Sequence, residues 1–459
     1  MADAPWGGDA CSLVEAYRAG KHSPKEELEA VLTAIESSDL GAFCHVDGVA
    51  ARDAAAGADV SLPFGGVPMG IKELEPVEGW PAEEASLVFA GERWSHTSTQ
   101  VTRLRAAGAV LAGQTTASEF GGLSVGITRA HGITRNPWDT SRTTGGSSAG
   151  SSAAVAGGLV PIASGGDGGG SIRKPAGFCG LLGMKGTAGR IPRGPKTTIG
   201  PLTVVVGCQA RSVRDVARWY DVCSGYDAHD PYSLPRVYGW ERDLGISDFK
   251  GKTAVIAPTL GVGAVHPGVD ALVREHGEHI ARDAGLRLVD IPVVVPSIGM
   301  EWALSNLVTL RNDLGDRWPD CAEDLTLEIG FGLRMAEGIY NLAIAAQGER
   351  NRVAMNEAIA NLFDQVDFVI CATNPDVACG ADVTLPSYVN GVNVGAENDG
   401  VLTQPANISG VPAISIPVGT LDGLPVGMQV MARHHADAQL LDLALIAERE
   451  RPWPLVAPR

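Results

Sequence analysis

The spacing of apolar residues predicts alternating helices and strands along most of the chain. Apolar positions recur at helical spacing between residues 11 and 36, and Ser23 followed by Pro24 suits the start of a helix there. Short apolar runs of strand length occur at 67–72 and 109–113, on either side of a helical run that ends at Gly108. This alternation favours an α/β architecture.

A second alternation follows in the C-terminal half. It predicts a helix from Pro267 to Ala284 capped by Gly285, a mainly helical stretch at 301–363, and a final helix at 436–449. Strands are predicted at 252–257, 287–291, 366–371, 413–416 and 428–431. The 375–403 segment is rich in Gly, Asn and Asp, and we expect it to be a loop that covers a site.

Two glycine-rich segments, 144–151 and 165–173, carry serines and are the first indication of chemistry. Successive backbone amides in such turns can stabilise a developing oxyanion, and a serine beside them can attack a carbonyl. The stretch at 153–163 is too apolar for a flexible Gly/Ser linker, so we expect it to be buried. On the residues alone, the candidate nucleophiles are Ser147, Ser148, Ser151 and Ser171.

Three shorter motifs suggest other functions and are rejected. Residues 146–150 fit G-x-S-x-G with Ser148 as nucleophile, but that motif needs a preceding strand, and 135–142 is predicted to be a loop. The tripeptide at 251–253 lacks the upstream glycine of a phosphate-binding loop. His276 and His279 share a helix face without a third ligand, so no metal site is expected.

Lys72 closes the apolar run at 67–72 and is a candidate base. A lysine with an ordinary pKa of ~10.4 is almost entirely protonated near pH 7. Burial or a neighbouring cation would have to lower the pKa of Lys72 before its amine could accept a proton.

Composition limits the partners and the compartment. The 459-residue chain is 45% hydrophobic and carries a formal charge of −17, which is unfavourable for binding nucleic acid. It has no basic leader and no run of 18 apolar residues, so we expect a cytoplasmic protein that does not contact membranes. Eight cysteines without C-x-x-C spacing predict free, buried thiols.

Taken together, the motifs resemble one known family. Residues 143–151 and 170–180 resemble the amidase signature sequence, and Gly70-Ile71-Lys72-Glu73-Leu74 resembles the lysine motif of that family. Residues 404–413 and 423–429 resemble its C-terminal core, whereas roughly 215–400 matches weakly. The chain departs from the family pattern at Glu73, where aspartate is usual, and at Gly166 and Gly168, where threonines are common.

The resemblance implies a three-layer α/β/α fold around a large twisted mixed β-sheet, in one compact domain. Within it we expect an N-terminal helical region (1–60), the amidase signature core (61–214), a variable, partly helical section that forms the substrate pocket (215–400), and the C-terminal part of the core (401–459).

The resemblance also implies the role of each site residue. Ser171 is the expected nucleophile, Ser147 the bridging serine on a cis peptide bond, and Lys72 the terminal base. The expected oxyanion hole consists of backbone amides, those of Gly168, Gly169, Gly170 and Ser171. Ser148, Asp167 and Arg173 are expected to support the site, and the cycle needs neither a metal nor an organic cofactor.

The implied activity is hydrolysis of a C–N acyl bond through an acyl-enzyme. Overall resemblance to bacterial aryl amidases and urethanases favours an aryl amide or a carbamate as the small-molecule substrate, with esterase side activity. Two alternatives stay open: the glutaminase subunit of a tRNA-dependent amidotransferase, and a non-catalytic protein that binds an anion with the same amides. The chain is expected to be a monomer or a homodimer.

Overall fold

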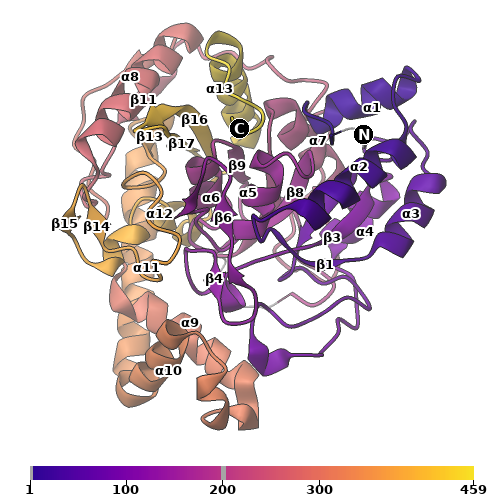
Figure 1. Ribbon diagram of the computed structural model, residues 1–459. Coiled ribbons are helices and arrows are strands. Elements are labelled where there is room, and N and C mark those ends of the chain that lie inside the picture. The colour runs from indigo at the N-terminus through magenta and orange to yellow at the C-terminus, as the bar shows by residue number, and fades with distance from the viewer. Residues whose placement is uncertain (1–3, 198–202, 459) are drawn as a thin grey trace.

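A computed structural model describes residues 4–197 and 203–458 of the chain (Figure 1). Its centre is a sheet of 11 strands. The strands, in spatial order, are β1 (Phe43–Val46), β3 (Val110–Thr115), β2 (Pro68–Lys72), β8 (Ile162–Asp167), β10 (Val205–Ala210), β9 (Leu182–Lys185), β16 (Ala413–Leu421), β17 (Leu424–Ala432), β13 (Phe368–Ala372), β11 (Thr253–Ile256) and β12 (Arg287–Leu288).

The sheet is mixed, as the sequence predicted. β2 runs parallel to both β3 and β8, and β11 runs parallel to β12 and β13, whereas the strands between these two groups pair antiparallel. Every residue of β13 is buried, because helices cover both faces of the sheet, and its sequence is accordingly a continuous apolar run.

Helices form a layer on each face of the sheet, which completes the predicted three-layer α/β/α arrangement. α5 (Ala149–Ala156) and α6 (Arg173–Cys179) pack together on one face, and Val31 of α2 (Pro24–Ser37) joins the apolar cluster around α5. On the other face α13 contacts both α7 and α8. The helices of this layer are α1 (Ala10–Arg18), α4 (Thr99–Ala106), α7 (Val213–Cys223), α8 (Pro267–Ala284) and α13 (Asp437–Glu450).

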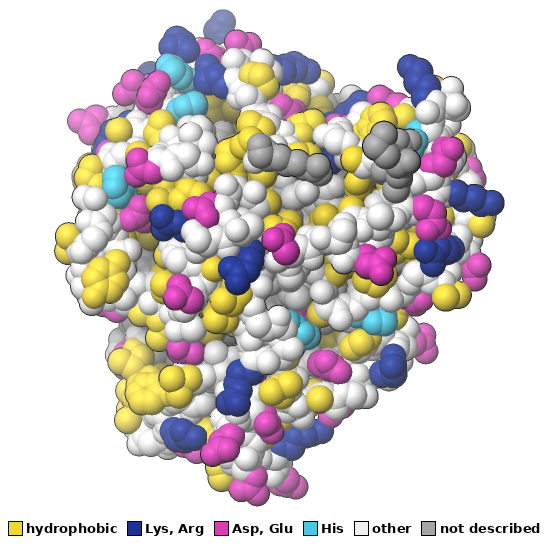
Figure 2. All heavy atoms as spheres, viewed as in Figure 1, with side chains coloured by type: hydrophobic (Ala, Val, Ile, Leu, Met, Phe, Trp, Pro, Cys, Tyr) yellow, Lys and Arg dark blue, Asp and Glu magenta, His cyan; other side chains and the backbone are white. Residues whose placement is uncertain are grey.

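Helices α9 (Gly299–Leu314), α10 (Leu327–Ile339) and α11 (Leu342–Phe363) confirm the helical prediction for 301–363. α9 and α10 lie at the lower edge of the molecule, away from the sheet (Figure 1). They have a small apolar cluster of their own, which includes Leu314, Trp318 and Leu333. Leu327, Phe331 and Leu342 are nevertheless exposed, and hydrophobic side chains gather over this region of the surface (Figure 2).

Local structure differs from the sequence predictions in several segments. Residues 135–142, predicted as a loop, contain β6 (Arg135–Asn136) and β7 (Asp139–Thr143), a two-stranded sheet separate from the main one. The strand predicted at 287–291 is only the two-residue β12. The N-terminal helical region also contains α3 (Gly48–Ala56) and contributes the edge strand β1.

The long segment at 375–403 has structure of its own. It contains the hairpin of β14 (Tyr388–Val389) and β15 (Val392–Asn393), followed by a 3₁₀ helix (Ala396–Asp399), and it leads into α12 (Gln404–Ile408). A second small hairpin, β4 (Ile127–Thr128) with β5 (Gly132–Ile133), lies earlier in the chain.

The thiols and the surface bear on the remaining expectations. All eight cysteines are free thiols, and Cys44 and Cys379 are only partly buried. Within the described ranges, no helix is long and apolar enough to cross a lipid bilayer. On the face shown in Figure 2, basic and acidic side chains are interspersed.

Candidate active site

The site residues meet where two parallel strands end. β2 and β8 are neighbours in the sheet and run in the same direction, so their carboxyl ends, Lys72 and Asp167, lie at the same edge. Ligands of open α/β sheets bind outside such carboxyl ends. α5 begins just after Ser147, and residues 168–171 form the turn from β8 into α6.

Lys72 reaches the serines of the first glycine-rich turn. Its Nζ lies 2.7 Å from Ser147 Oγ and 3.0 Å from Ser148 Oγ. Its backbone N–H donates to Ser164 Oγ at 2.9 Å, which fixes the end of β2 against β8. The Gly146–Ser147 peptide bond is cis, as expected. Two segments that are far apart in sequence therefore present a lysine amine and a hydroxyl to each other.

Burial tunes the lysine. Only 3% of the Lys72 surface is exposed. Desolvation lowers the pKa of Lys72 to about 7, although the negative charges of Asp167, Glu73 and Glu75 act in the opposite direction. A large fraction of Lys72 is then neutral near pH 7, which is the state that a general base requires.

The four candidate serines occupy different environments. Ser151 is buried and its hydroxyl is bonded to Thr115 Oγ1 and to the Ser164 carbonyl, both at 2.7 Å. Ser148 is also buried, and its Oγ accepts from the Gly166 N–H at 3.3 Å in addition to its contact with Lys72. Ser171 is partly exposed, and its carbonyl accepts from the Ser148 N–H at 3.2 Å. Of these candidates, Ser171 is the one that solvent or a substrate can reach.

A buried ion pair holds the second turn. Arg173 donates to Asp167 through Nε at 3.0 Å and through a terminal nitrogen at 2.9 Å, and neither side chain is exposed. Burial alone would raise the pKa of Asp167, but the charge and hydrogen bonds of Arg173 and a hydrogen bond from Asn407 hold it well below its usual range. Asp167 is therefore ionised, and Arg173 keeps its partner.

The Asp167 carboxylate also shapes the backbone of the turn. It accepts hydrogen bonds from the N–H groups of Gly170 at 2.7 Å and Ile172 at 3.2 Å. The Gly170 amide, which we expected among the oxyanion donors, is thus already engaged. Among the residues that the structure describes, the N–H groups of Gly168, Gly169 and Ser171 have no acceptor.

Sequence reasoning missed the C-terminal residues that support this turn. Thr403 Oγ1 donates to the Gly169 carbonyl at 2.6 Å, and Asn407 Nδ2 donates to the Asp167 carbonyl at 3.0 Å. Arg173 also donates to Gln429 Oε1 at 2.5 Å. Asn407 and Gln429 belong to the C-terminal segments already noted for their family resemblance, which is the signal that could have identified them.

The end of the 375–403 segment is attached to the site. Lys174, which follows Arg173 in α6, forms an ion pair with Asp399, and Ser124 donates to the same carboxylate. Lys174 Nζ also donates to the Asp399 carbonyl at 2.7 Å. This contact links the variable section of the chain to the helix that begins beside Ser171.

Comparisons with known proteins agree with this arrangement. The sequence profile of the family described as Amidase matches residues 26–441. One of the glutamyl-tRNA(Gln) amidotransferase subunits of Chloroflexus aggregans is 33% identical, with 95% of each chain covered.

Solved structures give a similar result. A bacterial aryl acylamidase of the amidase signature enzymes superimposes with a TM-score of 0.87 at 26% identity, with 97% of each chain covered. A 6-aminohexanoate cyclic dimer hydrolase, solved with its substrate, gives a TM-score of 0.85 at 27% identity, with 98% of each chain covered.

Proposed function

This chain belongs to the amidase family, and from that premise we propose that it hydrolyses an aryl amide or an aryl carbamate through an acyl-enzyme on Ser171. The observation that carries the proposal is the contact of 2.7 Å between the buried Lys72 amine, with a pKa of about 7, and Ser147 Oγ. The likeness to the aryl acylamidase over 97% of the chain supports an aromatic substrate.

Acylation begins with a relay of two protons. Neutral Lys72 accepts the Ser147 proton, Ser147 accepts the proton of Ser171, and the Ser171 oxygen attacks the substrate carbonyl. The resulting lysine ammonium then returns a proton through Ser147 to the leaving nitrogen, the C–N bond breaks and the amine departs. Ser171 keeps the acyl group as an ester.

The negative charge of the tetrahedral intermediate needs donors. The N–H groups of Gly168, Gly169 and Ser171 are our proposed oxyanion hole, and Gly170 is omitted because its amide bonds to Asp167. Loss of one such donor costs on the order of 10²–10³ in rate in comparable sites.

Deacylation reverses the first half of the cycle. Water donates a proton to the same Ser147–Lys72 relay and attacks the ester carbonyl, the tetrahedral intermediate collapses, and the proton returns to Ser171. The acid leaves, and the site regains its neutral lysine.

The test uses the purified full-length chain without any added protein. A chromogenic anilide, an aliphatic amide, an aryl carbamate, an aryl ester and glutamine are supplied in parallel. We expect turnover of the anilide or the carbamate, weaker cleavage of the ester, and no turnover by Ser171→Ala. Binding of inorganic anions without turnover of any of these compounds would instead support the non-catalytic alternative.

A second candidate is the glutaminase component of a tRNA-dependent amidotransferase. It is favoured by the relative of Chloroflexus aggregans, whose name is that of an amidotransferase component, at 33% identity. The two candidates differ in their dependence on a companion protein. Strict preference for glutamine, with activity only when companion proteins are added, would favour the glutaminase and contradict the aryl substrate.

A further inference from the structure

Three side chains that commonly bind metals meet outside the catalytic contacts. They are Cys44 on the edge strand β1, Glu73 directly after β2, and His131 in the turn between β4 and β5. One potential ligand atom from each lies within 4.8 Å of the other two, and His131 Nε2 is 2.8 Å from Glu73 Oε2. The chain separations of these residues gave no sign of this cluster.

Each of the three residues is held in place by other contacts. Glu73 uses one carboxylate oxygen to accept from the Ala117 N–H at 2.5 Å, which leaves the other oxygen facing His131. The His131 backbone N–H donates to Thr128 Oγ1 at 3.0 Å and fixes the turn. The Cys44 thiol lies 3.6 Å from the Gln114 carbonyl on the neighbouring strand β3.

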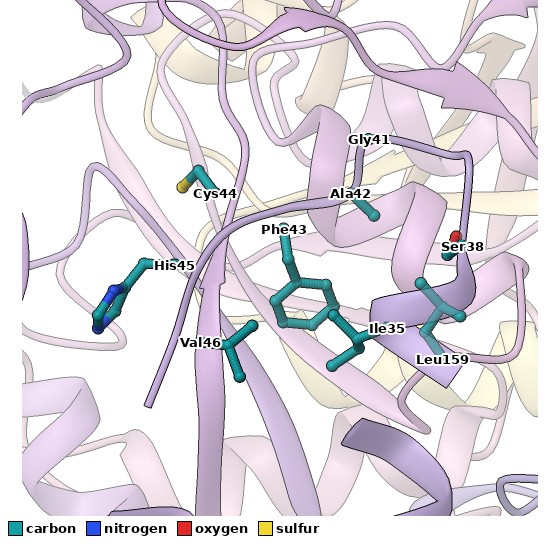
Figure 3. A pocket seen from close by; sticks show the side chains of 9 residues that line it. All are labelled: Ile35, Ser38, Gly41, Ala42, Phe43, Cys44, His45, Val46 and Leu159. Atoms are coloured by element: carbon teal, nitrogen blue, oxygen red, sulfur yellow. The ribbon is translucent and has the colours of Figure 1, made fainter. Parts of the chain in front are cut away.

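The cluster is sheltered but not sealed. The Glu73 side chain is 4% exposed and that of His131 is 17% exposed, so the imidazole offers a route from solvent. Glu83 adds a second negative charge that acts on both Cys44 and His131. A small cavity of about 170 Å³ lies against β1, and Figure 3 shows Cys44 projecting to the opposite side of that strand from Phe43.

We propose that Cys44, Glu73 and His131 bind a divalent transition metal ion, with Zn²⁺ as the best match. A thiolate, an imidazole and a carboxylate are its usual ligands, at about 2.0–2.3 Å. Tetrahedral ligands at those distances are roughly 3.3–3.8 Å apart. The His131–Glu73 contact of 2.8 Å therefore opens slightly on binding, while any wider separation, up to 4.8 Å, contracts.

Charge and protons balance in this site. The metal displaces the Cys44 thiol proton and any proton on the His131 ring, and both are released to solvent. Thiolate and carboxylate then neutralise the divalent ion, His131 binds as the neutral ring, and water fills the fourth position. The ion would join the edge strand, the residue after Lys72 and the β4–β5 turn, so it acts as a clamp on the fold rather than in the acyl transfer.

The test is a titration of the reduced, metal-free, full-length chain with Co²⁺, which reports thiolate ligation through a charge-transfer band in the near ultraviolet. We expect one equivalent to bind with that band, Zn²⁺ to displace it, and the melting temperature to rise with either ion. Cys44→Ser should abolish the band. His131→Gln should weaken binding at least about tenfold, the smallest loss seen for residues that support metal ligands.

Two matched variants complete the experiment. Cys379→Ser removes the other partly buried thiol, and His279→Gln removes one member of the histidine pair on α8, and neither should change the titration. A band that persists in Cys44→Ser, or no thiolate band in the wild-type chain, would overturn the proposal. In that case the cluster is a buried His131–Glu73 ion pair beside a thiol.

Discussion

At the scale of single residues, burial makes a lysine basic at neutral pH, but only contact makes it a catalytic base. Lys185 is as deeply buried as Lys72, and burial likewise lowers the pKa of Lys185 to about 7, with the charge of Arg173 acting in the same direction. Its Nζ donates to the Gly186 carbonyl at 3.0 Å, whereas Lys72 meets Ser147 and Ser148. The perturbed pKa therefore identifies two candidates, and the geometry selects Lys72.

Substitutions of the relay residues test these assignments. Ser171→Ala is expected to abolish turnover, because the nucleophile is lost. Lys72→Ala and Ser147→Ala should each reduce kcat/KM by several orders of magnitude, since residues that act as one unit fail together. Ser148→Ala is the matched control: it removes one contact with Lys72 but no proton carrier, so its loss should be much smaller. Equal inactivity of Ser148→Ala and Ser171→Ala would refute the division of roles.

The pH dependence of the reaction follows from the state of Lys72. The base acts when neutral, and its pKa is about 7, so kcat/KM should fall as the pH drops below that value and level off above it. On the acid side the loss should approach about tenfold per pH unit, as one proton titrates. A profile of kcat/KM against pH between roughly 5 and 9 measures this. A flat profile across the acid side would mean that a different group is the base.

At the scale of elements, the turn between β8 and α6 depends on one glycine more than on the others. Gly170 has φ +122, and a Cβ added there would lie 2.4 Å from Thr403 Oγ1. Gly168 has no such strain, and an added Cβ would meet only Val204 Cγ2 at 3.2 Å. Val204 is 43% exposed and has room to shift.

These two positions provide a matched pair of variants. Gly170→Ala should displace the proposed oxyanion donors and reduce kcat by at least about 10², comparable to losing one donor. Gly168→Ala should change kcat several-fold at most. Similar losses in both variants, with both proteins folded by circular dichroism, would show that the donors do not depend on the backbone of Gly170.

Elements with strong local signals could be predicted from the sequence. The helix from Pro267 to Ala284 was predicted to the residue, because a proline near its start and a left-handed Gly285 after its end mark both boundaries. The strands β1 and β7 were missed, since they are short and depend on pairing with distant segments for their stability. The five-residue strand expected at 287–291 is shorter because only its first two residues pair with β11.

At the scale of the whole molecule, the Asp167–Arg173 pair joins three parts of the chain. It bonds to Asn407 and Gln429 from the C-terminal segment as well as to its own turn. A buried pair that loses one partner leaves an uncompensated charge, which costs about 3–5 kcal/mol. Asp167→Asn should therefore lower the free energy of unfolding by roughly that amount.

Denaturant unfolding of matched variants measures this cost. Glu29→Gln breaks the exposed pair with Arg52 and serves as the control, with no expected change in the unfolding midpoint. Equal midpoints for Asp167→Asn and Glu29→Gln would show that the buried pair does not hold the segments together.

The site itself could be predicted only in part. Lys72, Ser147 and Ser171 were identified from motifs, and the structure brings Lys72 and Ser147 into contact. The engagement of the Gly170 amide and the support from Thr403 could not be foreseen, because they depend on where a segment more than 200 residues away returns to the turn. The roles assigned to the three residues stay predictions until they are measured.

The measurement that tests the central claim most directly is identification of the acylated residue. The wild-type chain is mixed with an activated aryl carbamate or anilide, quenched with acid before the steady state, digested and analysed by mass spectrometry. We predict an acyl group on Ser171 that is absent in Ser171→Ala and that disappears as product forms. An acyl group on Ser147 or Ser148, or turnover without any covalent intermediate, would contradict this mechanism.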